Sequence, residues 1–284
     1  MRRLLVAIGL VVSFAPSAYA APDTDVWERW QAHDADSEAT IDHSAFTAFL
    51  NKYVVVHDEG PNGVRYDEVS AADRDKLENY IESMEQIEID DYSRPVQRAY
   101  WIDLYNAETI DIVLEHYPVA SMDDIGGGWF HHGPWDDHVL EVEDEKLTLN
   151  DIEHRILRPI WDDELTLYGL SRAAMSAPSL RPRAYTGADV HQALVDNAQK
   201  YVNSPEGLRF VDDSQVVASK LYDWYQADFG GDTLGVIQHL REYAAPALSA
   251  RLDVAHRIDG YAYDRSLNSE RQIQDHGFSP QKDD

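Results

Sequence analysis

The sequence predicts an α+β fold: a predominantly helical single domain with a small antiparallel sheet. Stretches with apolar residues at helical spacing dominate between residues 44 and 252, and only a few short alternating stretches fit strands. Helical and strand patterns do not alternate regularly, which disfavours a parallel sheet built from βαβ units. We therefore divide the chain into an N-terminal segment, residues 1–20, and one domain, residues 21–284.

The N-terminal segment is typical of a secretory signal peptide. Arg2 and Arg3 precede an apolar run from Leu4 to Phe14, and the small-residue sequence Ala18-Tyr19-Ala20 follows. The run is too short to span a membrane, which takes about 20 apolar residues. We expect a periplasmic or secreted protein that begins near Ala21 and is not inserted in the membrane after cleavage.

Composition excludes several function classes. The chain has no cysteine, which rules out disulfides, thiolate metal sites, catalytic thiols and the lipid anchor of a lipoprotein. It carries 52 acidic and 24 basic residues, for a net charge of −28, and such acidity disfavours nucleic-acid partners. The acidity fits a hydrated surface or cation binding. The best calcium-loop candidate, residues 34–38, is followed by Ala39 where glycine is required, so we discount it.

Two amphipathic helices are expected near the N-terminus. The first runs from Ser44 to Val56, and a turn at residues 60–63 (GPNG) follows it. The second runs from Ala71 to Ile87, with Ser70 as its cap.

The clearest helix runs from Ser93 to Tyr117, because Pro95 suits its first turn and Pro118 stops it. Apolar residues surround most of its middle, which predicts a central position in the fold. Asp103 and Asn106 share one stripe of this helix and should face the interior. Each must then bond backbone groups or line a site.

An aromatic segment follows the triple glycine at residues 126–128. Trp129 and Trp135 are expected to form a lid or wall over a ligand site. His131 and His132 are adjacent, which is poor geometry for chelation, and His138 would be needed as a third ligand. We predict no metal site and no cofactor.

A hairpin is expected from the alternation of residues 139–149 around Asp144-Glu145. Asn150 can then cap a helix, with Glu153 at the third position reaching back to the cap. His154 and Arg158 fall together on the face opposite the core side, so His154 is either solvated or directed into a cleft.

The remaining elements are short and mostly helical. Helices are expected at residues 187–202, 219–229, 234–243 and 246–252, and short strands at residues 209–212 and 258–263.

Five sequence blocks resemble the domain of unknown function 547 family, in the form that bacteria export. They occur in the family's order over nearly the whole of residues 21–284, and they are YWIDLYNA (100–107), LNDIEHRILRP (149–159), SAPSL (176–180), WYQADFGG (224–231) and YDRSLN (263–268).

The resemblance implies a thiol site that this chain lacks. Family members usually carry asparagine at the position of Asp103, histidine at Leu167, and cysteines at Arg172 and Ala177. In the family, a glutamate–histidine pair with a cysteine implies an activated nucleophile or a thiol ligand. Here His154 remains without a cysteine, so that chemistry cannot run as written.

Other residues offer substitutes. Ser171 or Ser176 with His154 and Asp103 would form a triad, although a hydroxyl is a weaker nucleophile than a thiolate. Arg172 could bind a carboxylate or phosphate, or could pair with a local acid.

We therefore hypothesise a binding or scaffolding domain for an unknown small molecule or peptide. Arg172, Asn106, Ser171, Ser176, Trp129 and Trp135 are the candidate ligand-binding residues. The alternative is a hydrolase or transferase that uses His154 as general base with water or a serine, supported by Glu153 and Asp103. The sequence does not determine the oligomeric state or whether any catalysis remains.

Overall fold

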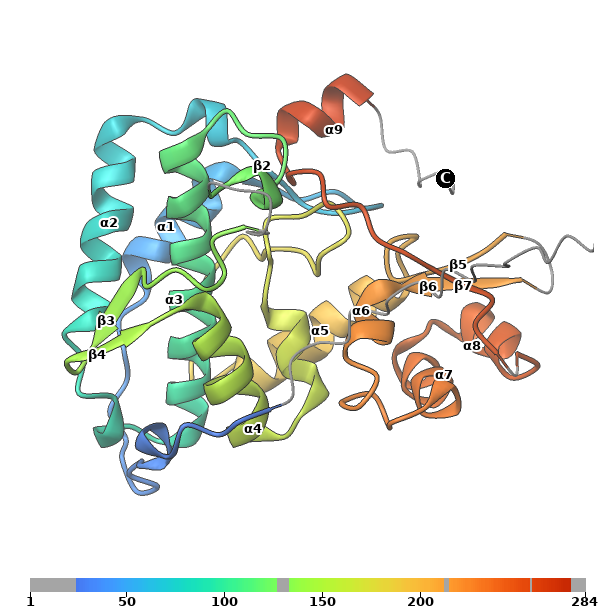
Figure 1. Ribbon diagram of the computed structural model, residues 1–284, viewed down its shortest axis with the longest axis horizontal. Coiled ribbons are helices and arrows are strands. Elements are labelled where there is room, and N and C mark those ends of the chain that lie inside the picture. Colours follow the sequence, from blue (N-terminus) through green and yellow to red (C-terminus); the bar gives the residue numbers. More distant parts are fainter. Residues whose placement is uncertain (1–23, 127–132, 212–214, 256, 277–284) are drawn as a thin grey trace, which may run out of the picture.

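The computed structural model describes residues 24–126, 133–211, 215–255 and 257–276 (Figure 1). The predicted signal peptide, residues 1–20, lies outside the described residues, as do Trp129, His131 and His132.

Helix α3 (Arg94–His116) is the centre of the fold, as its apolar sequence predicts. Seventeen of its residues are buried, from Val96 to Val113. Helices α1 (Ser44–Tyr53) and α2 (Ala71–Glu85) lie on one side of it in Figure 1, and α5 (Val190–Val202) packs on it from another. Ser70 caps α2 as predicted, because its hydroxyl accepts a hydrogen bond from the backbone N–H of Asp73.

Helix α1 is shorter than the sequence predicts. It ends at Tyr53, and strand β1 (Val54–Val55) pairs antiparallel with β2 (Gly63–Val64). Three successive valines, 54–56, explain the difference, because β-branched side chains favour extended backbone over helix. The predicted turn at residues 60–63 connects the two strands.

The predicted hairpin is present, with its turn one residue earlier than expected. Strands β3 (Leu140–Val142) and β4 (Glu145–Leu147) pair antiparallel, and Val142 faces Glu145. Glu143 and Asp144 form the two-residue turn, with positive φ values of 49° and 66°. Two positive φ values give a turn whose twist matches the flanking strands.

A three-stranded sheet occupies the other side of the molecule in Figure 1, where α6 (Lys220–Trp224), α7 (Thr233–Tyr243) and α8 (Pro246–Leu252) lie near it. Its strands are ordered β5 (Leu208–Phe210), β6 (Val216–Ser219) and β7 (Gly260–Ala262). The sequence predicts the two edge strands but not β6, whose four residues are all buried and therefore show no alternation. The pair β5–β6 is antiparallel, whereas β6–β7 is parallel.

After β7 the chain crosses back over the molecule to α9 (Glu270–His276), and we call residues 263–269 the C-terminal strap. The backbone N–H groups of Met175 and Ser176 donate to the carbonyls of Ser266 and Asp264, at 2.8 and 3.1 Å. Further along, Asn268 accepts from the N–H of Val64 at 2.8 Å. The strap thus connects a central loop with the N-terminal hairpin.

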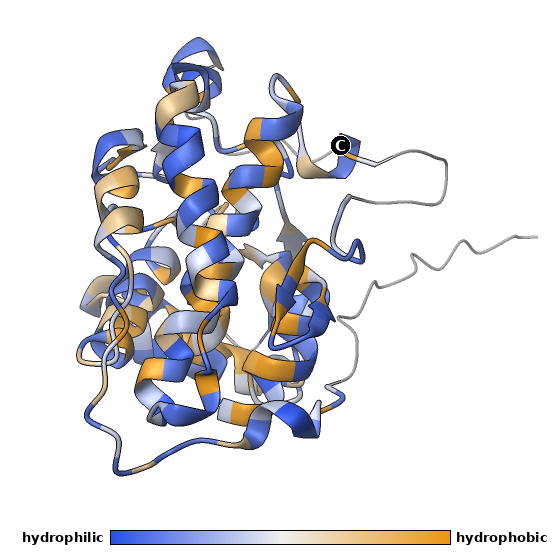
Figure 2. Cartoon of the chain, turned by 90° about the vertical axis from the view of Figure 1, so that its left-hand side faces the viewer, coloured by the Kyte–Doolittle hydropathy of each residue, from blue (hydrophilic) through white to orange (hydrophobic). Residues whose placement is uncertain are grey.

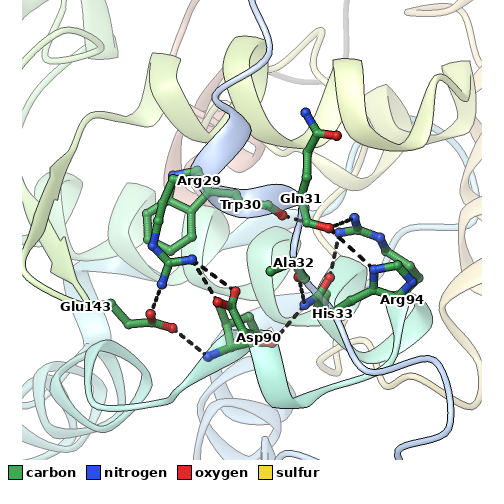
Figure 3. A network of polar contacts seen from close by, with 10 residues as sticks. Arg29, Trp30, Gln31, Ala32, His33, Asp90, Arg94 and Glu143 are labelled. Atoms are coloured by element: carbon green, nitrogen blue, oxygen red, sulfur yellow. Dashed lines mark hydrogen bonds and ion pairs between the residues drawn. The ribbon is translucent and has the colours of Figure 1, made fainter.

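The N-terminal 3-10 helix η1 (Glu28–Gln31) is attached to the core by charged side chains (Figure 3). The Arg29 guanidinium donates to both Asp90 carboxylate oxygens, at 3.1 and 2.9 Å, and also to Glu143 in the β3–β4 turn. Arg94 donates to backbone carbonyls at the end of η1. These contacts join three segments that are distant in sequence.

Buried apolar side chains from the N-terminal helices through to Leu267 in the strap form one contiguous cluster. In Figure 2 the helices carry hydrophilic and hydrophobic residues in turn, as amphipathic elements around a shared core do. No helix within the described ranges is long and apolar enough to cross a membrane.

Candidate functional site

The helix that carries Glu153 and His154 is capped by Thr148, so the predicted cap is wrong. The Thr148 hydroxyl accepts from the N–H of Asp151 at 2.9 Å, and Asp151 Oδ2 accepts from the N–H of Thr148 at 3.0 Å. This reciprocal pair is a capping box. Asn150 already has helical backbone angles and makes no capping hydrogen bond. The sequence fits a capping box in two ways, with Thr148 and Asp151 or with Asn150 and Glu153. The structure adopts the first, which leaves Glu153 free for another role.

Substituting Thr148 by alanine should therefore destabilise the protein by about 1 kcal/mol, the usual effect of losing a cap. Asn150→Ala, at the cap predicted from sequence, should change stability by less than half as much. Urea denaturation of the two variants compares them directly. Equal losses, or a larger loss for Asn150→Ala, would contradict the assignment.

Glu153 and His154 lie in a π-helix, η5 (Asp151–Leu157), which continues into α4 (Arg158–Trp161). The N–H of Arg158 donates to the carbonyl of Glu153, five residues earlier, so the turn is wider than in an α-helix. Such segments are rare and occur frequently at functional sites. As the sequence predicts, His154 and Arg158 lie together, and both are buried.

Glu153 is the centre of a buried polar cluster. It is 3 % exposed, and its Oε1 accepts from Arg172 Nη2 at 2.5 Å and from the hydroxyl of Tyr225. Arg172 Nη2 also donates to the Tyr225 hydroxyl at 3.2 Å. The hydroxyl of Tyr105, on α3, lies 3.5 Å from Glu153 Oε2. Of the two roles open to Arg172 in the sequence, the structure places it in an ion pair with a local acid.

This cluster holds Glu153 ionised. Burial opposes its ionisation, but the positive charge of Arg172 and the hydrogen bond from Tyr225 outweigh burial and lower the pKa of Glu153 to about 2. Glu153 therefore stays a carboxylate at every physiological pH. It supports Arg172 rather than the helix cap.

His154 is neutral and fixed in one tautomer. Burial lowers the pKa of its imidazole, and the charges of Arg158 and Arg172 lower it as well, although the Glu153 carboxylate opposes the shift. Arg158 Nη1 lies 2.9 Å from His154 Nδ1, and because an arginine can only donate, Nδ1 is the acceptor. The ring proton therefore resides on Nε2.

Arg158 and Tyr225 complete the inner wall. Arg158 forms a two-pronged ion pair with Asp228, at 3.2 and 2.6 Å. The ring of Tyr225 contacts the guanidinium groups of Arg158 and Arg172, at 4.9 and 5.2 Å from its centroid, and stacks on His154 at 6.2 Å. Charged planar groups thus surround one tyrosine, which favours a rigid arrangement.

A cavity of about 150 Å³ opens beside this cluster. Its walls come from five parts of the chain: α3, the segment before the β3–β4 hairpin, the π-helix, the loop at Arg172, and the C-terminal region. The lining residues are Tyr105, Ser121, Met122, Asp123, Trp135, Asn150, Glu153, His154, Arg172, Ala174, Trp224, Tyr225, Tyr263 and Arg265.

Asp103 does not join His154. It is 1 % exposed, its Oδ1 accepts from the backbone N–H of Tyr185 at 3.1 Å, and its Oδ2 lies 3.4 Å from His43 Nδ1. Tyr105 is the residue of α3 that faces Glu153, and residues two apart on a helix point to nearly opposite sides. Asp103 therefore does not contact His154, and the predicted pairing of these two residues is not formed.

The side chains of Asn106 and Ser176 bond backbone groups. Asn106 donates to the carbonyl of Gly169 at 2.8 Å and accepts from the N–H of Ser171 at 3.0 Å, so it shapes the loop that presents Arg172. The Ser176 hydroxyl accepts from the N–H of Asp264 in the strap at 2.8 Å. Within the described part of the chain, neither serine lines the cavity or bonds His154, so the predicted triad is not assembled.

Of the two tryptophans predicted to cover the site, one lies in the described part of the chain and lines the cavity. Trp135 lines the cavity, whereas Trp129 lies outside the described residues. The alternative of a metal site depended on His131 and His132, which also lie outside them. Among the side chains that are described, no three His, Asp or Glu residues are grouped as metal ligands.

The sequence analysis missed four aromatic residues that line the cavity: Tyr105, Trp224, Tyr225 and Tyr263. All four occur in blocks that carry the family resemblance, namely YWIDLYNA, WYQADFGG and YDRSLN. The presence of these residues in the family blocks was the one sign in the sequence that they could belong to a site. Local patterns could not bring them together, because their contacts join residues far apart in the chain.

Comparison with known proteins finds that part of the chain is similar to a family without an assigned activity. No curated protein and no solved structure matches the chain. The family model described as "Protein of unknown function, DUF547" matches residues 89–202, which include α3, the π-helix, the Arg172 loop and α5. Residues 89–202 are therefore similar to the DUF547 family.

Proposed function

We propose that this protein binds a small molecule in the cavity beside Glu153, His154 and Arg172 and does not transform it. One observation carries the proposal: both groups suited to proton transfer are already occupied. Glu153 is held by Arg172 and Tyr225, and His154 Nδ1 accepts from Arg158. What remains is a cavity lined by both aromatic and polar side chains, a composition that suits a binding site.

The hydrolase alternative is less well supported. A general base needs a lone pair within reach of the proton that it removes. In His154 that lone pair is on Nδ1 and is directed at Arg158, while burial lowers the pKa of the imidazole and so weakens it as a base. Of the predicted nucleophiles, Ser176 accepts a backbone hydrogen bond from Asp264, and neither Ser171 nor Ser176 is among the described residues that line the cavity.

The size of the cavity limits the ligand. A cavity of about 150 Å³ can hold a single aromatic ring, whereas sites for drug-sized ligands measure about 300 to 1,000 Å³. We therefore expect a molecule, or a terminal group of a longer molecule, of about ten non-hydrogen atoms.

The proposal is tested by a fragment library in ligand-observed NMR. Ala174 lines the cavity, so the larger side chain of Ala174→Leu should occupy it and abolish a subset of the fragment signals. Ala45→Leu is the matched control, because Ala45 lines a separate groove between α1 and α2. The proposal fails if no fragment is lost in Ala174→Leu alone. It also fails if the protein hydrolyses a peptide, amide or ester and His154→Ala abolishes that turnover.

A further inference from the structure

The chemical class of the ligand can be inferred from the polar groups of the cavity, an inference that rests on the proposed binding function. The hydroxyl of Tyr263 is buried and has no hydrogen-bond partner within the described residues, although Tyr263 lines the cavity. Burying a polar group without a partner is unfavourable, so an unpaired hydroxyl on a residue that lines a cavity needs a reason. A ligand atom that bonds it supplies one.

The hydroxyl of Tyr263 acts as a donor. Burial raises the pKa of Tyr263 to about 12, so the phenol keeps its proton at neutral pH. His154 also offers a donor, because Nδ1 accepts from Arg158 and the ring proton is on Nε2. Two residues that line the same cavity therefore carry a neutral donor.

The carboxylates of the cavity already have cationic partners. Glu153 is paired with Arg172 at 2.5 Å, and Asp123 is paired with Arg265 at 3.0 Å. A cationic ligand would have to compete with arginines that are already in place. A ligand that accepts hydrogen bonds meets donors and two guanidinium groups without displacing any existing pair.

The apolar part of the wall is built for a flat group. The rings of Trp224 and Tyr263 lie 4.8 Å apart, and the guanidinium of Arg265 lies 5.0 Å from the Trp224 centroid. Tyr225, Trp135 and Met122 add further apolar surface. Aromatic rings favour offset or edge contacts with other rings, so a planar ligand would gain packing here.

We propose that the cavity binds a small aromatic carboxylate. Its carboxylate accepts hydrogen bonds from the Tyr263 hydroxyl and from the His154 side of the cavity, near Arg172. Its ring packs against Trp224. Tyr263 and Trp224 lie outside the stretch that matches the family model, residues 89–202, so ligand specificity comes from the C-terminal region of the chain.

Three probes that share one ring but differ in charge test this inference: benzoate, benzamide and benzylamine. Each is titrated into the full chain at 150 mM salt, where screening reduces the repulsion between an anion and a chain of net charge −28. We expect benzoate to bind with a millimolar Kd, at least about tenfold tighter than benzylamine. Tyr263→Phe should weaken benzoate binding about tenfold, the usual loss of a hydrogen bond to a charged group.

Two controls make the result specific. Tyr261→Phe removes a hydroxyl two residues away that does not line the cavity, and it should leave benzoate binding unchanged. Without ligand, Tyr263→Phe should be at least as stable as the wild type, because the hydroxyl it removes is unpaired among the described residues. A folding defect is thereby separated from a loss of binding.

Each contrary outcome has a distinct meaning. Tightest binding of benzylamine or benzamide would overturn the carboxylate assignment and leave the proposed binding function standing. Unchanged benzoate affinity in Tyr263→Phe would overturn the role of the hydroxyl. If none of the three probes binds, the inference is wrong, and the Ala174→Leu fragment screen decides separately whether the cavity binds another class of molecule.

Discussion

Replacing Arg172 by methionine is expected to lower the free energy of unfolding by about 3 to 5 kcal/mol at pH 7. Both partners of the Arg172–Glu153 pair are buried, with side chains 11 % and 3 % exposed. Breaking a buried pair from one side leaves an uncompensated charge, which costs about that much. Urea denaturation of the purified variant measures the loss. A loss below about 1 kcal/mol would show that the pair contributes little.

The double variant Glu153→Gln/Arg172→Met is the control for this prediction. It removes both charges, and its glutamine oxygen can still accept from the Tyr225 hydroxyl, so most of the lost stability should return. The pH dependence provides a second control. The pKa of Glu153 falls from 4.5 to about 2 on folding, which contributes about 3 kcal/mol above pH 4.5. That contribution is lost as the pH falls through about 2, and it should be absent in both variants.

Replacing Asp103 by asparagine should stabilise the protein at pH 7. Asp103 is fully buried, and burial raises the pKa of its carboxyl well above 3.8. A carboxyl with a raised folded-state pKa lowers stability as the pH rises above 3.8, by about 1.4 kcal/mol for each pKa unit. An amide avoids this and can still accept from the N–H of Tyr185 through its oxygen. Asparagine is also the residue that the family resemblance implies at this position.

The gain from Asp103→Asn should exceed about 1 kcal/mol at pH 7 and shrink toward pH 4, as measured by urea denaturation at both values. Asp151→Asn is a matched control of opposite sign. Although burial opposes its ionisation, hydrogen bonds from Arg155 and Thr148 lower the pKa of Asp151. The same substitution should therefore destabilise at pH 7. If Asp103→Asn destabilises the protein equally at both pH values, the carboxyl has a structural role that charge does not explain.

The helical framework could be predicted because its signals are local. Pro95 and Pro118 bound α3, and Ser70 caps α2, each within one turn of the helix that it defines. Where two local signals competed, prediction failed. Thr148 with Asp151 and Asn150 with Glu153 both fit a capping box, and only the distant Arg172 decides between them.

The candidate site was predicted only in part because its contacts are long-range. His154 and Arg158 are four residues apart, so their contact followed from helical spacing. Tyr225 and Tyr263 reach Glu153 and the cavity from beyond residue 202, and no local periodicity signals such contacts. Pairing Asp103 with His154 rested only on the fact that a carboxylate can orient a histidine. In the structure, Tyr105 on the opposite face of α3 is the residue that faces Glu153.

The C-terminal strap has a consequence for how this protein acquires its cavity during synthesis. Tyr263 and Arg265 leave the ribosome after all the other residues that line the cavity, yet their segment bonds the loop that follows Arg172. Until then, Tyr263 and Arg265 are absent from the cavity that Glu153 and Arg172 line. Contacts of such long sequence separation form late and slowly. A chain that stops short of residue 263 would thus contain the whole family-matched stretch and still lack a finished cavity.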